Sequence, residues 1–154
     1  MTDWSIRPFA APDQDAVKAL VLAGLADHWG ELDLTLNPDL NDIAAWYAPQ
    51  RGQTVVAVLD DEIVGTGTLR EVEPGTAELV RMSVSSAHRG KGLGKGLVRH
   101  LTDLATASGY ATLICETTDT WQDATALYLS CGFEIYDQHD GDYFFRLPLV
   151  MSDR

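Results

Sequence analysis

The chain has 154 residues, 45% of them hydrophobic, and a formal net charge of −12. A chain of this length typically folds around a single hydrophobic core, so we expect one domain over residues 1–154. No apolar run is long enough to cross a bilayer, and the first residues lack the basic and apolar regions of a signal peptide; we therefore expect a cytoplasmic protein with no membrane partner. The negative charge argues against nucleic-acid binding, because a phosphate backbone would be repelled.

The first third of the chain predicts a strand and two helical segments. Residues Trp4 to Pro8 have the pattern of a short strand that ends at a proline. Asp13 is a suitable N-cap for a helix with an apolar face from Ala16 to Leu25. Asn37-Pro38 opens a second helical segment, which Pro49 ends.

The middle of the chain predicts an antiparallel sheet. Thr54 to Leu59 and Ile63 to Leu69 are expected to form a hairpin. The turn Glu73-Pro74-Gly75 then leads into a third strand, Thr76 to Val84.

A glycine-rich basic run, Arg89 to Gly96 (RGKGLGKG), separates this strand from the next helix. The order strand, glycine-rich turn, helix presents free main-chain N–H groups at a helix N-terminus, and glycine lets a bulky anion approach closely. The helix dipole favours negative charge there, and Arg89, Lys91 and Lys95 add positive charge. These features predict a phosphate or diphosphate site.

Spacing decides which phosphate pattern fits this run. The P-loop pattern fails, because Arg89 and Gly96 occupy its required glycine and Ser/Thr positions. The dinucleotide pattern G-x-G-x-x-G lacks its last glycine from either possible start. The pattern that fits is R-x-x-G-x-G, at Arg89, Gly92 and Gly94.

The last third predicts a helix, a strand, a second helix and a closing hairpin. The strand is expected to run parallel to the one before the glycine-rich run, because a helical crossover joins them. The expected ranges are helix Leu93 to Ser108, strand Ala111 to Glu116, helix Trp121 to Cys131, and strands Phe133 to Tyr136 and Tyr143 to Leu149. Cys115 and Cys131 stand in apolar surroundings and are expected to be reduced, and no Cys/His spacing indicates a metal site.

Three segments together carry a family resemblance. The R-x-x-G-x-G loop, the strand Ala77 to Val84 before it, and the late segment Ala124 to Phe133 (A-x-x-L-Y-x-x-x-G-F) occur in the order found in the GNAT superfamily of N-acetyltransferases. The chain resembles this family from about Ile6 to Leu149. The resemblance implies an α/β (α+β) GNAT fold, with a mixed, mostly antiparallel central sheet of about seven strands and about four helices on both faces.

The resemblance also implies the reaction and the cofactor site. It implies acetyl-CoA as co-substrate without a metal, a primary amine of a small molecule or peptide as acceptor, and a possible homodimer. A bulge near the end of the fourth strand would open a slot beside it for the pantetheine arm. The implied cofactor-binding residues are Met82, Ser83, Val84, Arg89, Gly90, Lys91, Gly92, Leu93, Gly94 and Lys95.

Catalytic roles follow from the same resemblance. Tyr128 matches the family's tyrosine and is expected to protonate the departing thiolate, the alternative being a packing role. A main-chain N–H near Met82 would polarise the carbonyl group. Glu78 is expected to be the general base, with Glu116 as a rival. Arg81 lies three residues from Glu78 and is expected on the opposite face of the sheet if the strand is regular.

Some assignments remain open at this point. Trp121 stands where relatives often carry asparagine, so its contact with the cofactor is undecided. The first helices would shape the acceptor pocket, with wall residues His28, Trp29, Trp46 and Tyr47. Two other functions remain as alternatives: a non-catalytic acyl-CoA-binding or sensory module, and a nucleic-acid-binding protein that uses the basic loop, which the net charge disfavours.

Overall fold

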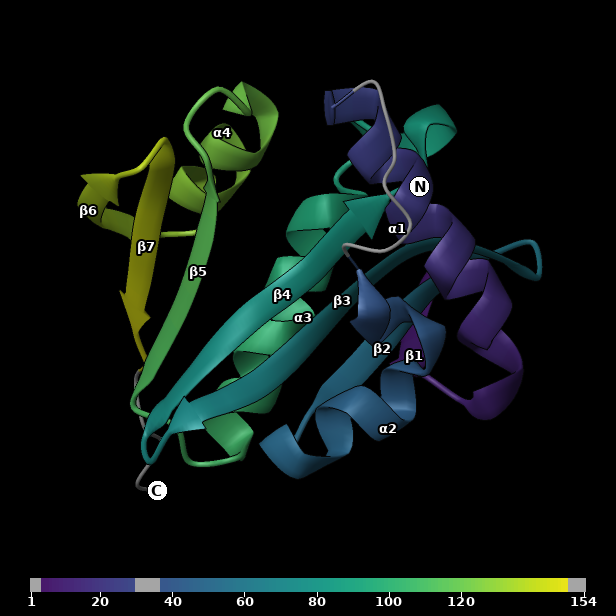
Figure 1. Ribbon diagram of the computed structural model, residues 1–154, viewed down its shortest axis with the longest axis horizontal. Helices are drawn as coiled ribbons and strands as arrows, with labels where there is room; N and C mark the ends of the chain where they lie inside the picture. Colours follow the sequence, from purple (N-terminus) through teal and green to yellow (C-terminus); the bar gives the residue numbers. More distant parts are fainter. Residues whose placement is uncertain (1–3, 30–36, 150–154) are drawn as a thin grey trace.

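The computed structural model describes residues 4–29 and 37–149. Its seven-stranded sheet has the order β1-β2-β3-β4-β5-β7-β6 (Figure 1). Among the strands of these described ranges, only β4 and β5 pair in parallel, as the crossover predicts. The strands are β1 (Ser5–Pro8), β2 (Gln53–Leu59), β3 (Glu62–Glu73), β4 (Thr76–Val84), β5 (Thr112–Thr118), β6 (Glu134–His139) and β7 (Asp142–Pro148).

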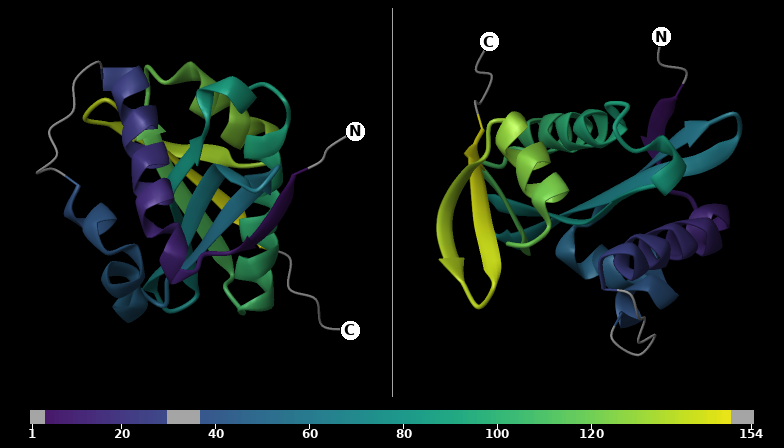
Figure 2. Two further views of the ribbon diagram at one scale, coloured as in Figure 1. Left: turned by 90° about the vertical axis from the view of Figure 1, so that its right-hand side faces the viewer. Right: turned by 90° about the horizontal axis from the view of Figure 1, so that it is seen from above.

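Helices cover both faces of this sheet. The described α-helices are α1 (Gln14–Trp29), α2 (Ile43–Tyr47), α3 (Leu93–Ala107) and α4 (Gln122–Ser130). Figure 2 shows α1 and α2 on one face and α3 and α4 on the other. The expected mixed sheet with helices on both faces is therefore confirmed. No helix in the described ranges has the length and apolar character needed to span a membrane.

Each helical layer has its own apolar core. The helix α3 buries the face that its spacing predicts, through Leu93, Leu97, Val98, Leu101 and Ala105. These side chains pack with Leu69, Leu113 and Phe145 of the sheet. The core under α1 and α2 is formed by Val17, Val21, Leu40, Ile43, Tyr47 and Val56. Each fully buried Leu, Val or Phe stabilises the fold by about 1.5–3 kcal/mol.

Two helical predictions differ from the structure. The expected second helix is divided into η3 (Pro38–Asn41), α2 and η4 (Ala48–Gln50), because Asp42 takes a non-helical conformation and caps α2 through the N–H of Ala45. Asp13 does not cap α1 in the expected way. Its carboxylate accepts hydrogen bonds from the main-chain N–H of Ala10 and from the Arg7 guanidinium.

A bulge in β4 determines the shape of the centre of the sheet. Val80 pairs with Thr68 and Ser83 with Thr66, which leaves two residues of β4, Arg81 and Met82, opposite the single residue between those partners. Arg81 has a left-handed φ of 56°. This is the bulge that the family resemblance implies, and no residue pattern in the sequence reveals it.

The strands β4 and β5 separate at the same place. They pair only from Thr76 to Glu78 on β4 and from Thr112 to Ile114 on β5, and beyond this point they diverge (Figure 1). A gap between two neighbouring strands leaves main-chain groups on their facing edges without ladder partners. The fold thus opens its central sheet between β4 and β5.

The bulge also corrects an expectation about Arg81. Leu79 packs with the α3 core and Val80 with the α1 core, so Glu78 faces the same side as Val80. The Arg81 side chain also reaches the α1 side, where it binds Asp39. The prediction that Arg81 and Glu78 lie on opposite faces is wrong, because the extra residue reverses the alternation at Arg81.

Candidate active site

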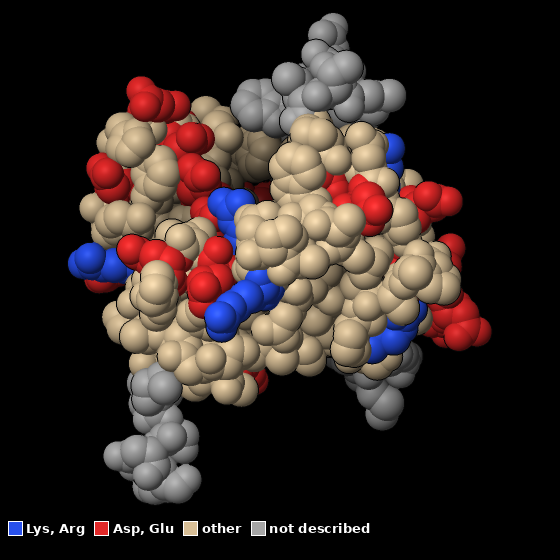
Figure 3. Space-filling model, turned by 60° about the horizontal axis from the view of Figure 1, so that its bottom comes forward, with Lys and Arg blue, Asp and Glu red and all other residues tan. Residues whose placement is uncertain are grey.

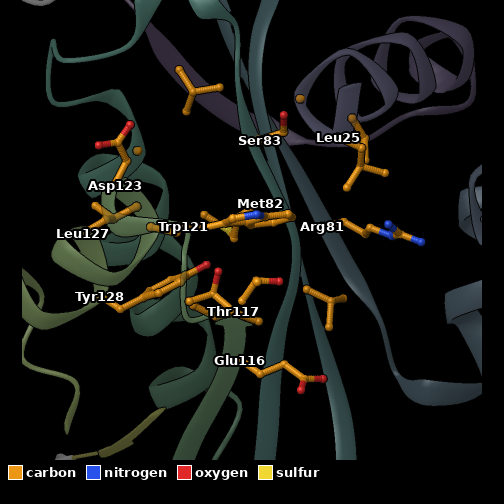
Figure 4. Close-up of a pocket in the computed structure, with 18 of the residues that line it drawn as sticks. Leu25, Arg81, Met82, Ser83, Glu116, Thr117, Trp121, Asp123, Leu127 and Tyr128 are labelled. Atoms are coloured by element: carbon orange, nitrogen blue, oxygen red, sulfur yellow. The ribbon is translucent and has the colours of Figure 1, made fainter. Parts of the chain in front are cut away.

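A cleft of about 1140 Å³ opens where β4 and β5 diverge. Its walls come from both helical layers, with α1 and α2 on one side and α4 and the start of α3 on the other (Figure 4). This volume lies above the range of about 300–1,000 Å³ that is usual for small-molecule sites. Of the predicted site residues, the lining includes Glu78, Met82, Ser83, Val84, Arg89, Gly90, Gly92, Gly94, Lys95, Glu116 and Tyr128.

The start of α3 presents unsatisfied main-chain amides. Gly92 is the N-cap with a φ of 85°, and it has no side chain with which to cap the helix. The first amide with a main-chain acceptor is that of Gly96, which donates to Gly92 O over 3.0 Å. Within the described ranges, the N–H groups of residues 93–95 have no acceptor. Since Gly94 and Lys95 line the cleft, this helix end can accept an anion there.

The other residues of the loop have different positions. The Nε atom of Arg89 donates to Val84 O over 3.1 Å, which places this guanidinium beside the end of β4. Leu93 is buried in the α3 core, so only its main-chain amide is available to a ligand. Lys91 is exposed and does not line the cleft.

Tyr128 lies at the α4 side of the cleft. Its ring packs against Phe133 and Phe145, with centroid distances of 5.7 and 5.4 Å. Figure 4 shows its hydroxyl and that of Thr117 directed into the same part of the cleft. Neither hydroxyl has a hydrogen-bond partner in the described part of the chain. Burial raises the pKa of Tyr128, so it remains a protonated phenol at neutral pH.

Glu78 is engaged in an ion pair on the α1 side of the cleft. Its Oε1 atom accepts hydrogen bonds from Nε and Nη2 of Arg70 over 2.9 and 2.5 Å. Arg70 also donates to Gln50. The Glu78 side chain is only 10% exposed, so this pair is largely shielded from water. The carboxylate oxygen Oε1 of Glu78 is therefore already occupied by the Arg70 guanidinium.

Glu116 is the unpaired carboxylate of the same region. Within residues 4–29 and 37–149 it has no hydrogen-bond or ion-pair partner. Partial desolvation at the cleft wall raises the pKa of Glu116, although this residue is exposed, and the nearby carboxylates of Glu78 and Asp142 raise the pKa further. Arg70 and His139 act in the opposite direction. The pKa of Glu116 is therefore shifted in the direction that a general base requires.

A buried network holds the bulge against the α1 layer. The Arg81 guanidinium donates to both carboxylate oxygens of Asp39 over 2.8 and 2.7 Å and to Asn37 over 2.9 Å. The Tyr47 hydroxyl donates to Asp39 over 2.7 Å. Burial alone would raise the pKa of Asp39, but the bonds from Arg81 and Tyr47 outweigh it and lower that pKa. Burial, with Asp39 adding to it, raises the pKa of Tyr47 to about 12.

The remaining predicted residues are placed as follows. Trp46 and Tyr47 line the cleft as expected, whereas the side chains of His28 and Trp29 lie outside the described part of the structure. Trp121 also lines the cleft, at the N-cap of α4. Cys115 and Cys131 are free thiols. In the described ranges, no group of His, Cys, Asp and Glu side chains is arranged to hold a metal ion.

Comparison with known proteins identifies relatives of this chain. The model of the acetyltransferase (GNAT) family matches residues 19–133. N-acetyltransferase 8F1 of Rattus norvegicus is 36% identical over 125 residues, which cover 77% of this chain and 57% of that protein. N-acetylaspartate synthetase of Homo sapiens is 39% identical over 125 residues, 80% of this chain and 41% of that protein. The chain thus spans about half the length of the curated relatives it matches.

Solved structures share the fold. A GNAT-family acetyltransferase of Staphylococcus aureus superposes with a TM-score of 0.84 at 21% identity, over 96% of this chain and 99% of that one. An N-acetyltransferase of Thermoplasma acidophilum in complex with coenzyme A has a TM-score of 0.82 at 16% identity, over 96% and 99% of the two chains.

Proposed function

The chain belongs to the acetyltransferase (GNAT) family, and from that premise we propose that it transfers an acetyl group from acetyl-CoA to a primary amine of a small molecule or peptide by direct attack. One observation carries this proposal. The amides at the start of α3 and the hydroxyl of Tyr128 line the same cleft, and none of them has a hydrogen-bond partner among the residues that the structure describes. An anion anchor and a proton donor therefore lie at different places in one cleft.

The loop before α3 fits the diphosphate of this co-substrate. The amides of Gly94 and Lys95 and the dipole of α3 would hold the negative charge. The side chains of Arg89 and Lys95 line the cleft beside these amides and would add positive charge. Residues Gly90 and Gly92 have φ values of 77° and 85°, which favour glycine, so this turn depends on them.

The divergence of β4 from β5 provides a place for an extended arm. Beyond Glu78 the β5-facing edge of β4 has no strand partner in the described chain, so its main-chain groups are available to a ligand that binds as an added strand. Met82, Ser83 and Val84 lie along this stretch and line the cleft. A main-chain N–H near Met82 would polarise the carbonyl group of the bound thioester.

Two side chains would transfer protons in the reaction, one as donor and one as acceptor. Acetyl-CoA supplies an activated acyl group: the amine nitrogen forms a bond to its carbonyl carbon, and the carbon–sulfur bond breaks. Tyr128 would donate its proton to the departing thiolate, and the second proton that the amine nitrogen loses on forming the amide would restore the phenol. The ion pair of Glu78 with Arg70 favours Glu116 over Glu78 as the acceptor of the ammonium proton. Glu116 and Tyr128 approach the gap between the strands from opposite faces of the sheet.

Thiol release from acetyl-CoA over a panel of primary amines tests the proposal. We expect amine-dependent release with at least one acceptor, together with a calorimetric signal on titration of coenzyme A. Binding of coenzyme A without turnover on any amine would favour a non-catalytic acyl-CoA-binding module instead. The absence of both signals would contradict the proposed cofactor and the proposed reaction.

A further inference from the structure

The side of the cleft that faces α1 and α2, here called the acceptor side, is rich in carboxylates. Figure 3 shows acidic side chains beside a hollow in this surface, on the side where β6 and β7 lie in Figure 1, with some basic side chains among them. Away from the start of α3, the charged residues that line the cleft are the carboxylates Asp39, Glu78, Glu116 and Asp142 and the guanidinium groups Arg70 and Arg81; Arg89 lies between the start of α3 and α1, and Asp123 lies on α4.

Both of these guanidinium groups are already occupied. Arg70 binds Glu78, and Arg81 binds both carboxylate oxygens of Asp39. Among the described residues, no unpaired Lys or Arg remains on the acceptor side to bind a carboxylate of a substrate.

On the acceptor side, two carboxylates, Glu116 and Asp142, have no partner among the described residues, and they lie close together. Glu116 pairs with Phe144 across β5 and β7, and Thr118 pairs with Asp142. Since Cys115 and Phe145 point into the α3 core, Glu116 and Asp142 point to the opposite face. As diagonal neighbours on one face, their Cα atoms are roughly 7–8 Å apart.

Independent features mark this cleft as a ligand site. The residues Thr117 and Tyr128 are more than nine-tenths buried, yet their hydroxyls are unpartnered in the described chain and directed into the cleft from the α3 face of the sheet, opposite Glu116 and Asp142 (Figure 4). Trp46 also lines the cleft and is 47% exposed. An exposed aromatic face attracts organic cations and covers their methylene groups.

We propose that the acceptor is an amine with a second positive charge, such as a diamine or polyamine. This inference rests on the proposed acetyl transfer and specifies its substrate class. Glu116 takes the proton of the reacting ammonium group, and Asp142 binds the second ammonium group. An acceptor with two carboxylates, such as the aspartate whose acetylated form is named in the relative N-acetylaspartate synthetase, would meet two unpaired carboxylates on the acceptor side and, among the described residues there, no unpaired Lys or Arg.

The test compares acceptors that differ by one charge. In thiol-release assays, we expect kcat/KM for 1,4-diaminobutane to exceed that for 1-aminobutane by about tenfold or more, because a partly shielded ion pair is gained. L-Aspartate should be the poorest acceptor of the three. In Asp142→Asn, the ratio of kcat/KM for diamine to monoamine should fall to about one. Calorimetric titration of coenzyme A checks that this variant still folds and binds.

The turn beside β7 offers a matched control. Asp140 has a side chain that is 93% exposed and does not line the cleft, and its left-handed φ of 54° is one that asparagine tolerates. In Asp140→Asn, the diamine-to-monoamine ratio should equal that of the wild type. A wild-type ratio near one, an unchanged ratio in Asp142→Asn, or a preference for L-aspartate would overturn this inference and leave acetyl transfer standing. No turnover with any amine would overturn both.

Discussion

At the scale of single residues, removal of the Tyr128 hydroxyl distinguishes a role as proton donor from a role in packing. In Tyr128→Phe, the ring contacts with Phe133 and Phe145 remain, whereas the proton donor is lost. We expect kcat to fall by about 10²-fold or more, with the affinity for coenzyme A and the melting temperature nearly unchanged. Steady-state kinetics, calorimetry and thermal unfolding give the three quantities.

The control for this substitution is Tyr136→Phe, which removes a hydroxyl from an exposed ring outside the cleft. Its kcat should match that of the wild type. An undiminished kcat in Tyr128→Phe, on an acceptor that the wild type acetylates, would assign Tyr128 to packing alone.

The two candidate bases are distinguished by a pair of conservative substitutions. The raised pKa of Glu116 places the ascending limb of the pH–rate profile above the ordinary range of a carboxyl group. We expect Glu116→Gln to lower kcat/KM by about 10²-fold and to remove that limb. Glu78→Gln should keep the limb. If Glu78→Gln removed the ascending limb and Glu116→Gln kept it, the general base would be Glu78.

The same two variants should differ in stability. A raised pKa in the folded state means that Glu116 favours folding when protonated, and that this contribution is lost as the pH rises through its folded-state pKa. At neutral pH, Glu116→Gln should therefore have a higher melting temperature than the wild type. At a pH below the ordinary carboxyl pKa, the two melting temperatures should be equal. Glu78→Gln weakens a charged hydrogen bond to Arg70 and should cost about 1–2 kcal/mol in urea unfolding.

At the scale of elements, the bulge of β4 depends on its contact with η3. In Arg81→Ala, the buried carboxylate of Asp39 loses its ion partner, and we expect the free energy of unfolding to fall by about 3 kcal/mol. Because the pKa of Asp39 is lowered in the fold, the contribution of this pair is present above the ordinary carboxyl pKa and is lost on acidification. Urea unfolding at two pH values measures both effects.

An exposed ion pair provides the comparison for the buried one. Arg146 and Glu134 are joined across β6 and β7 with both side chains about half exposed, so Arg146→Ala should cost no more than about 1 kcal/mol. If Arg81→Ala were no more destabilising than Arg146→Ala, the network around Asp39 would not be what holds the bulge to η3.

How far the sequence predicts the elements depends on the range of the interactions. The buried face of α3 and the parallel pairing of β4 with β5 were predictable, because helical spacing and the crossover are local signals. The bulge at Arg81 was not, because it is held by Asp39, a residue 42 positions away. For the same reason, the sequence could propose Glu78 as a base but could not detect its pairing with Arg70 across the β3–β4 hairpin.

At the scale of the whole molecule, the charge is divided between the two sides of the cleft. The cations Arg89 and Lys95 line the side at the start of α3, and the unpaired carboxylates Glu116 and Asp142 line the acceptor side. A net charge of −12 with one basic loop suits a polyanionic co-substrate and a cationic acceptor. The expected cytoplasmic location and homodimer stay predictions.

The central claim is that main-chain amides at the start of α3 hold the diphosphate of an acyl carrier. Calorimetric titration of the wild-type protein with coenzyme A and with pantetheine, which lacks the phosphates, tests it most directly. We expect coenzyme A to bind with a measurable heat and pantetheine to bind at least about 100-fold more weakly, because the anion contacts are lost. Equal affinities for the two ligands, or no heat with coenzyme A, would contradict the account.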